Sequence, residues 1–211
     1  MNKTIEVMVP NKEFIKLDKG YIRITSIVAY YAKKHSSRSG IYHLIFELSG
    51  GKTIAKKTSE KDIANLINGY DRRIGNSDQR FTTINGRKIA VAHIVKYYPR
   101  RIPNSDSYDV IFQLSNHKTI KSEQKDSWNA VVELMESYKK TMELAEQKFI
   151  TVHKTEINGV HVAMIGVERD VDAGHGYVVV ISLLTGEEVV VDKQQTLEAA
   201  RESTIRFQNM L

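Results

Sequence analysis

Two short stretches of the chain carry aromatic and cationic side chains in an order suited to binding single-stranded nucleic acid. The first reads Tyr30-Tyr31-Ala32-Lys33-Lys34, and the second reads Tyr97-Tyr98-Pro99-Arg100-Arg101. Single-strand binders combine rings that stack on unpaired bases with lysine or arginine that holds the phosphates. Because side chains alternate across a strand, we expect one tyrosine of each pair to enter the core and the other to face outward. The alternative is that the tyrosines are ordinary strand aromatics and the cations only keep a loop soluble.

A second group of cations follows each of these stretches, in the loop and hairpin further along the chain. Lysines on exposed edge strands also prevent aggregation, so this group has a structural explanation as well. The complete set of predicted nucleic-acid-binding residues is Tyr30, Tyr31, Lys33, Lys34, Arg38, Lys52, Lys56, Lys57, Tyr97, Tyr98, Arg100, Arg101, Lys118 and Lys121.

The two stretches occupy the same place in a longer repeat. An opening Phe, a Gly turn, an Ile-Val pair, the Tyr-Tyr pair, Phe-x-Leu-Ser and Lys-Thr-Ile occur in the same order after Phe14 and after Phe81. Phe81 follows Phe14 by 67 positions, and Phe149 follows Phe81 by 68. A diverged third version after Phe149 keeps a turn at Asn158-Gly159 and a later Tyr177. The spacing predicts three copies of one unit. We refer to residues 1–75, 76–146 and 147–211 as the first, second and third segments.

Each segment reads as ββββα, which predicts an α+β fold. In the first segment, apolar alternation favours two strands around a Gly turn, then strands over residues 41–48 and 53–57. Ser59 followed by Asp62 then resembles a helix N-cap. We expect an antiparallel four-stranded meander covered by its own C-terminal helix, with the clearest linker at residues 71–80.

The helices are predicted from apolar residues at helical spacing. The stripes that we expect to face the sheets are Ile63, Leu66, Ile67 and Tyr70 in the first segment, Val131, Val132, Leu134, Met135 and Tyr138 in the second, and Leu197, Ala200, Arg201 and Ile205 in the third.

Charge is distributed unevenly among the segments. The chain of 211 residues has a net charge of +6, but the first segment has 14 Lys/Arg against 7 Asp/Glu, the second 11 against 9, and the third 6 against 9. A basic surface supplies the counterion-release contribution to nucleic-acid affinity, although it also serves solubility. In the third segment Gly166-Val167-Glu168-Arg169 replaces the aromatic and cationic stretch. We therefore expect the third segment to serve another role, with assembly into a homo-oligomer as the candidate.

Several kinds of chemistry have no signal in the sequence. There is no cysteine, and no Gly-rich phosphate loop, nucleophile elbow or His-Glu-x-x-His motif occurs. The seven histidines have no metal-ligand spacing. We expect a protein that is not an enzyme and that needs no cofactor or metal. No stretch is apolar enough for a membrane span, and charge and Pro10 interrupt the region where a secretory signal would lie, so we expect a cytoplasmic protein.

The unit's pattern of Phe-Ile-x-Leu, Gly, Ile-x-Ile-x-x-Ile-Val, Tyr and Leu-Ser-x-Gly-Lys-Thr-Ile resembles small bacterial and phage proteins of the swarming-motility or flagellar type. The topology of three ββββα units also resembles the Pur-alpha proteins, and the Whirly family uses related units. Both of these families bind single-stranded nucleic acid. The Pur-alpha resemblance implies that two units form a binding domain while the third serves dimerisation.

Two functions remain open from the sequence. The leading hypothesis is a nucleic-acid-binding protein that prefers single-stranded DNA or RNA and contacts it through the first two segments. The alternative is a protein-interaction module, such as a bacterial or phage accessory or inhibitor protein. The first predicts a basic surface lined with tyrosine, and the second predicts an exposed apolar patch or an unpaired strand edge.

Overall fold

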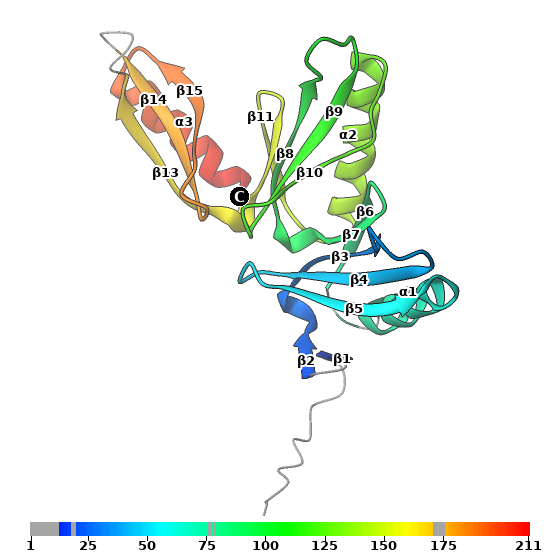
Figure 1. The fold of residues 1–211 in the computed structure, drawn as a ribbon. Coiled ribbons are helices and arrows are strands. Elements are labelled where there is room, and N and C mark those ends of the chain that lie inside the picture. The colour runs from blue at the N-terminus through cyan, green and yellow to red at the C-terminus, as the bar shows by residue number, and fades with distance from the viewer. Residues whose placement is uncertain (1–12, 18–19, 76, 78, 171–175) are drawn as a thin grey trace, which may run out of the picture. The chain divides into compact units, whose positions relative to one another are not determined.

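The computed structural model describes residues 13–17, 20–75, 77, 79–170 and 176–211. These residues form a mixed α+β protein with three α-helices and antiparallel sheets (Figure 1). The elements of the first segment are β1 (Phe14–Leu17), β2 (Gly20–Arg23), the 3-10 turn η1 (Ile24–Ser26), β3 (Ile27–Lys34), β4 (Ile41–Leu48), β5 (Thr53–Ser59) and α1 (Glu60–Gly75).

The same order of elements occurs in the other two segments. The second contains β6 (Phe81–Ile84), β7 (Arg87–Ala90), η2 (Val91–His93), β8 (Ile94–Arg101), β9 (Tyr108–Leu114), β10 (Thr119–Lys121) and α2 (Trp128–Glu143). The third contains β11 (Phe149–Val152), β12 (Thr155–Asn158), η3 (Gly159–His161), β13 (Val162–Arg169), β14 (Tyr177–Leu183), β15 (Glu188–Gln194) and α3 (Leu197–Met210). Among the described residues, each segment thus has five strands where we expected four, because a 3-10 turn divides the predicted second strand.

The sheets do not coincide with the segments. The first large sheet has the order β5-β4-β3-β7-β6, so the hairpin that opens the second segment completes a sheet begun in the first. The second has the order β10-β9-β8-β12-β11 and takes its hairpin from the third segment. The remaining sheets are β13-β14-β15 and the hairpin β1-β2. The expected self-contained meander is therefore wrong in this respect.

This sharing of hairpins moves the boundary between compact units. The chain divides into Met1–His93 and Ile94–Leu211, and not at the predicted linker over residues 71–80. The helix α1 continues through the first half of that linker to Gly75, and β6 begins at Phe81, directly after the linker ends. Because β6 and β7 pair with the first sheet, the break falls after them.

In the first unit, the core lies between the sheet and α1. Tyr30, Phe46 and Tyr70 form a chain of rings whose centroids are 5.8 and 5.3 Å apart. The predicted stripe Ile63, Leu66 and Ile67 packs against this core, as expected. The helix starts at the predicted cap, where the Asp62 amide donates to the Ser59 hydroxyl over 3.2 Å.

In the second unit, α2 covers β8 and β9 while α3 covers the third sheet (Figure 1). Val131 and Tyr138 are buried as predicted, but Val132 is 38% exposed and lies off the apolar stripe. Ser127 and Thr196 cap the two helices by accepting from Ala130 and Ala199 amides.

The predicted stripe of the third helix is wrong in part. Arg201 and Ile205 are exposed, whereas Ala200, Ser203 and Phe207 are buried. Ser203 belongs to this face because its hydroxyl donates to Asp192 of β15. A buried serine with a fixed partner does not appear in an apolar periodicity.

The hairpin turn of the third segment also differs from expectation. We predicted a turn at Asn158-Gly159, but these residues end β12 and begin η3. The turn lies at His153, which takes a left-handed φ of 54°, as Asn85 does (φ 46°) beside Gly86 in the second segment. This turn was missed because it contains neither glycine nor asparagine, the residues by which hairpin turns of this kind are recognised.

Candidate nucleic-acid interface

The first tyrosine of each predicted motif lies in the core. Tyr30 is 2% exposed and Tyr97 is fully buried. The Tyr30 ring lies 5.5 Å from Phe81, and its hydroxyl donates to Asp71 over 2.5 Å. Burial, together with Asp71, raises the pKa of Tyr30 well above its usual range. Neither ring has a free face for a base, so the structure removes Tyr30 and Tyr97 from the predicted set of stacking residues.

The second tyrosine of each motif faces the other side of its sheet and is half-buried. The Arg87 guanidinium lies 4.2 Å from the centroid of the Tyr31 ring, and the Tyr31 hydroxyl donates to Glu47 over 3.1 Å. Burial and the nearby Glu47 charge raise the pKa of Tyr31. Tyr98 has Lys96 at 5.7 Å from its ring centroid. Each ring thus brings a cation beside an aromatic face.

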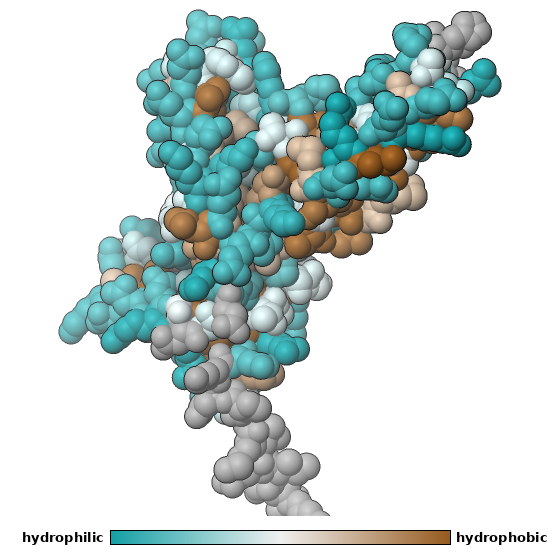
Figure 2. Space-filling model, turned by 180° about the vertical axis from the view of Figure 1, so that it is seen from behind, coloured by the Kyte–Doolittle hydropathy of each residue, from teal (hydrophilic) through white to brown (hydrophobic). Residues whose placement is uncertain are grey.

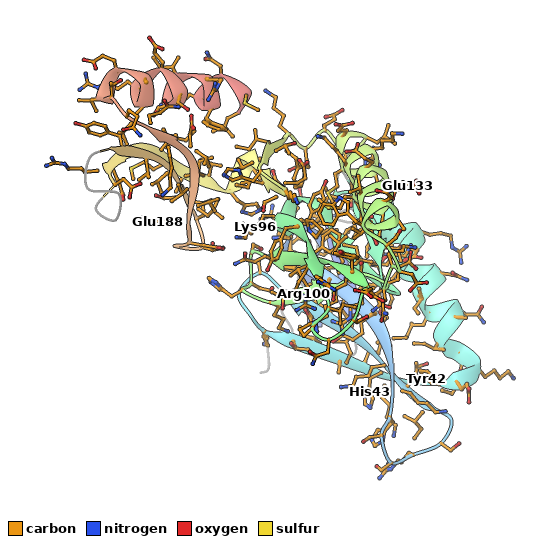
Figure 3. The ribbon with its side chains drawn as sticks, turned by 90° about the horizontal axis from the view of Figure 1, so that it is seen from above. Tyr42, His43, Lys96, Arg100, Glu133 and Glu188 are labelled. Atoms are coloured by element: carbon orange, nitrogen blue, oxygen red, sulfur yellow. The ribbon has the colours of Figure 1, made fainter. Side chains whose placement is uncertain are left out.

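The open face of the first sheet carries a short row of two lysines and a histidine. Lys33 pairs with His43 across β3 and β4, and His43 pairs with Lys57 across β4 and β5. Leu44 and Phe46 point into the core under α1, so the alternating position of His43 faces away from the helix. Figure 3 shows His43 on β4 next to Tyr42.

This row is accessible and carries uncompensated charge. Lys33 and Lys57 are exposed, and His43 between them is half-buried. No acid among the described residues forms an ion pair with either lysine. Tyr31 belongs to the adjacent row on the same face, where it pairs with Ile45. The face therefore combines two free cations with a cation-capped ring.

The corresponding face of the second segment is neutralised. The Arg100 guanidinium donates to both oxygens of Asp109, over 3.0 and 2.6 Å. This bond raises the pKa of Arg100. Arg101 donates to Asp106 over 2.6 Å. Both predicted cations of the second motif therefore have acidic partners, and the position that pairs with Arg100 is an aspartate where the first segment has His43.

The other predicted residues are dispersed. Lys34 is exposed but alternates to the helix side of the sheet, and Arg38 lies in the exposed loop after β3. Lys52 precedes β5 by one residue, so it lies roughly 17 Å along the strand from Lys57. The remaining predicted cations are the half-buried Lys56 and Lys118 and the exposed Lys121.

Sequence reasoning missed His43 and Arg87. The sequence contained a signal for His43: it alternates with the apolar Leu44 and Phe46 along one strand, so alternation places its side chain on the opposite, outward face. Arg87 belongs to the hairpin β6-β7, and only the sharing of that hairpin with the first sheet brings it to Tyr31.

Within the part of the chain that the structure describes, no group of three His, Asp or Glu side chains is arranged to hold a metal ion. None of the described helices has the length and apolar character needed to cross a membrane. Comparisons with protein-family models, with curated proteins and with solved structures found no match for this chain.

Proposed function

We propose that this protein is a non-catalytic binding protein that holds single-stranded nucleic acid on the open face of the first sheet. We also propose that its three segments are diverged copies of one ancestral ββββα unit. The recurring order of elements and the near-constant spacing of Phe14, Phe81 and Phe149 support the duplication. The compartment that we propose is the cytoplasm.

The observation that carries the proposal is the row Lys33, His43 and Lys57 beside Tyr31. Two exposed lysines without acidic partners supply phosphate contacts on a flat strand surface. The adjacent ring offers an aromatic edge and its bound cation Arg87. This is the pairing of charge and aromatic surface that sequence-independent single-strand binders use. The row lies in the segment with the largest excess of basic residues.

The second segment offers fewer unpaired cations than its sequence suggests. Arg100 and Arg101 each form an ion pair with an aspartate, so a phosphate would compete with a carboxylate for each guanidinium. We therefore propose that the first segment supplies the main contact and that Tyr98 and Lys121 form a separate, smaller contact on the second segment. Lys121 pairs with Ile111, which pairs in turn with Tyr98.

A protein-interaction module is the second candidate, and one observation favours it. The exposed large apolar residues of the described chain concentrate in the third segment: Val160, Met164, Leu184, Val190, Ile205 and Met210. Figure 2 shows brown residues along the part formed by β13, β14, β15 and α3. Such a surface suits a protein partner better than a nucleic acid.

The test is a titration of labelled single-stranded DNA, single-stranded RNA and duplex DNA with the full chain across a salt series. We expect salt-sensitive binding that is tighter to single strands. The variant Lys33→Ala/Lys57→Ala should weaken binding and reduce the slope of log affinity against log salt by about one unit per lost phosphate contact.

The matched control is Lys140→Ala/Arg201→Ala, which removes the same charge from exposed positions on α2 and α3. An equal loss in both variants would show that only net charge matters and would contradict a site on the first sheet. Absence of salt-sensitive binding by the unmodified protein would reject the proposal in favour of a protein partner.

A further inference from the structure

Two internal junctions of the molecule are built in the same way. In the first sheet the third and fourth residues of β3 pair with β7, as Ala29 with Ile89 and Tyr30 with Lys88. In the second sheet the third and fourth residues of β8 pair with β12, as Lys96 with Ile157 and Tyr97 with Glu156. Each hairpin therefore closes a sheet edge in one fixed antiparallel register.

The third sheet has the same edge without a hairpin on it. Its strand β13 corresponds to β3 and β8, and no strand among the described residues pairs with its outer side. The first four residues of β3 and of β8 are all buried. In β13 none of the first four is buried, and its third residue, Met164, is 57% exposed. An apolar edge with unpaired backbone groups is a template for another strand.

The hairpin β1-β2 has the matching form. Its internal register pairs Ile15 with Ile22 and Lys16 with Tyr21, as the other two hairpins pair the corresponding positions. Within the described part of the chain, β2 pairs only with β1. Tyr21 is 51% exposed, whereas Glu156, the second residue of β12, is 5% exposed in its junction. The apolar face of the hairpin, with Ile15 and Ile22, packs in the core of the first unit, but the outer edge of β2 has no paired strand among the described residues.

Charge distinguishes the two internal junctions from each other. In the first, Asp71 of α1 lies 3.7 Å from Lys88 of β7. In the second, Lys139 of α2 lies 3.6 Å from Glu156 of β12. Asp71 and Lys139 are each the twelfth residue of their helix, and the partners are each the second residue of their strand. The polarity is reversed, so either hairpin placed on the other sheet would bring like charges together.

The unpaired edges of β13 and β2 carry a third, uncharged combination. The twelfth residue of α3 is Gln208, and the second residue of β2 is Tyr21. Both are exposed, and a glutamine amide and a tyrosine hydroxyl can hydrogen-bond without leaving a charge unpaired. The hairpin β1-β2 thus suits the edge of β13 better than either of the other hairpins does.

We propose that β1-β2 of one protein molecule pairs with β13 of a second copy. Ile22 then lies opposite Met164, and Tyr21 lies opposite Ile165. Phe14 takes the place next to Ile165 that Phe81 and Phe149 take next to Tyr30 and Tyr97. Because the two surfaces are different, the assembly is head-to-tail and forms either a closed ring or an open filament.

The first test follows apparent mass against concentration by sedimentation velocity. We expect the mass of the unmodified protein to rise with concentration, to a plateau for a ring or without one for a filament. Met164→Lys places a charge on the edge and should keep the protein monomeric. The control Val190→Lys changes a residue that is 44% exposed on β15 of the same sheet and should assemble normally. A concentration-independent monomer in the unmodified protein would overturn the proposal.

The second test traps the register. The chain contains no cysteine, so single thiols can be introduced without interference. A mixture of Tyr21→Cys and isotope-labelled Ile165→Cys should form a disulfide-linked dimer of mixed mass on oxidation. A mixture of Tyr21→Cys with Val190→Cys is the control and should not. Equal cross-linking in both mixtures would contradict pairing between copies. So would a chain carrying both Tyr21→Cys and Ile165→Cys that forms only a disulfide within itself.

The third test uses charge. The double variant Tyr21→Lys/Gln208→Asp rebuilds the pair found between Lys88 and Asp71, and it should assemble at least as readily as the unmodified chain. Tyr21→Lys/Gln208→Lys brings like charges together, so the protein concentration at which assembly begins should rise at least roughly tenfold. Equal assembly of both variants would show that this face is not the interface. Because these residues lie outside the proposed row on the first sheet, oligonucleotide binding reports separately on the proposed function.

Discussion

β8 and β13 occupy the same position in two neighbouring sheets of one unit, but their surroundings differ. β8 has the hairpin β12-β11 on its outer edge, and its first four residues are buried. β13 has no such neighbour among the described strands, and its corresponding residues are exposed or half-buried. In Figure 3, Lys96 lies on β8, where it is only 9% exposed. Its ammonium group pairs with Glu187, in the turn between β14 and β15.

The difference shows that a strand's burial here depends on a hairpin contributed by the segment that follows. The two strands have similar lengths and both contact a helix on one face. β8 differs in having a paired strand on both sides, and the added hairpin also supplies contacts around Tyr97. Three comparisons test how far this difference extends into stability, and Trp128, the only tryptophan of the chain, provides a fluorescence signal within this unit.

The largest effect should come from the fourth residue of each strand. Tyr97→Ala removes a fully buried ring that contacts Phe112 and Phe149, and should lower the free energy of unfolding by about 3–5 kcal/mol. Ile165→Ala removes a half-buried side chain and should cost about 1–2 kcal/mol. Urea unfolding at low protein concentration measures both. Equal losses would mean that the free edge of β13 is as well packed as that of β8.

A smaller effect concerns how each helix is fixed to its sheet. α2 packs Tyr138 edge-on against Phe112, with ring centroids 4.9 Å apart, whereas α3 bonds Asp192 through Ser203 and Arg206. Asp192→Asn should cost about 1–2 kcal/mol at neutral pH, because an amide replaces a carboxylate that accepts charge-assisted bonds.

This polar attachment should also be sensitive to acid. Hydrogen bonds from Ser203 and Gln194 hold the pKa of Asp192 below its ordinary value of 3.8. A lowered folded-state pKa means that the stabilisation is complete above that ordinary value and is lost as the pH falls through the folded-state pKa. The difference in unfolding free energy between the unmodified chain and Asp192→Asn should therefore shrink in acid. Glu202→Gln, an exposed change on α3, is the control. A difference that stays constant with pH would show that the carboxylate charge contributes nothing.

The smallest effect should be the same in both helices. Ser127→Ala and Thr196→Ala each remove a side chain that accepts a hydrogen bond from a first-turn amide, and each should cost about 1 kcal/mol. Ser127→Asp, which keeps an acceptor, should restore most of the loss. Thermal unfolding of the four proteins compares them directly. A much larger loss at Thr196 would locate the weakness of the third sheet in its helix and not in its open edge.

The elements of this fold could be predicted from sequence more fully than their pairing. Alternating apolar residues and the Ser59 cap marked the strands and the first helix because these signals are local. The pairing of β3 with β7 was not predictable in this way, because the same alternating pattern satisfies a hairpin folded on its own segment or on the preceding one. The sequence also gave no indication that Ser203 would replace an apolar residue on α3, since its burial depends on Asp192 eleven positions away.

The predicted binding surface shows the same limit. Strand alternation correctly indicated that one tyrosine of each pair would be buried, which the structure shows for Tyr30 and Tyr97. Strand alternation could not indicate that Asp109 would form an ion pair with Arg100, because the register between β8 and β9 depends on the length of the loop between them. Binding of nucleic acid by the remaining residues stays a prediction.

The shared hairpins also determine the order in which the chain can become structured during synthesis. Strand β3 ends at Lys34, but its neighbour β7 begins only at Arg87, more than fifty residues later. A ribosome adding about 5–20 residues per second leaves the edge of β3 uncovered for several seconds. Throughout that interval an apolar strand is open to any passing hairpin of the same kind, including those of neighbouring chains on one messenger RNA. Once α1 has been made, Asp71 disfavours closure of this edge by a hairpin with an acid in the place of Lys88, and Lys139 disfavours closure of the second sheet by a hairpin with a base in the place of Glu156.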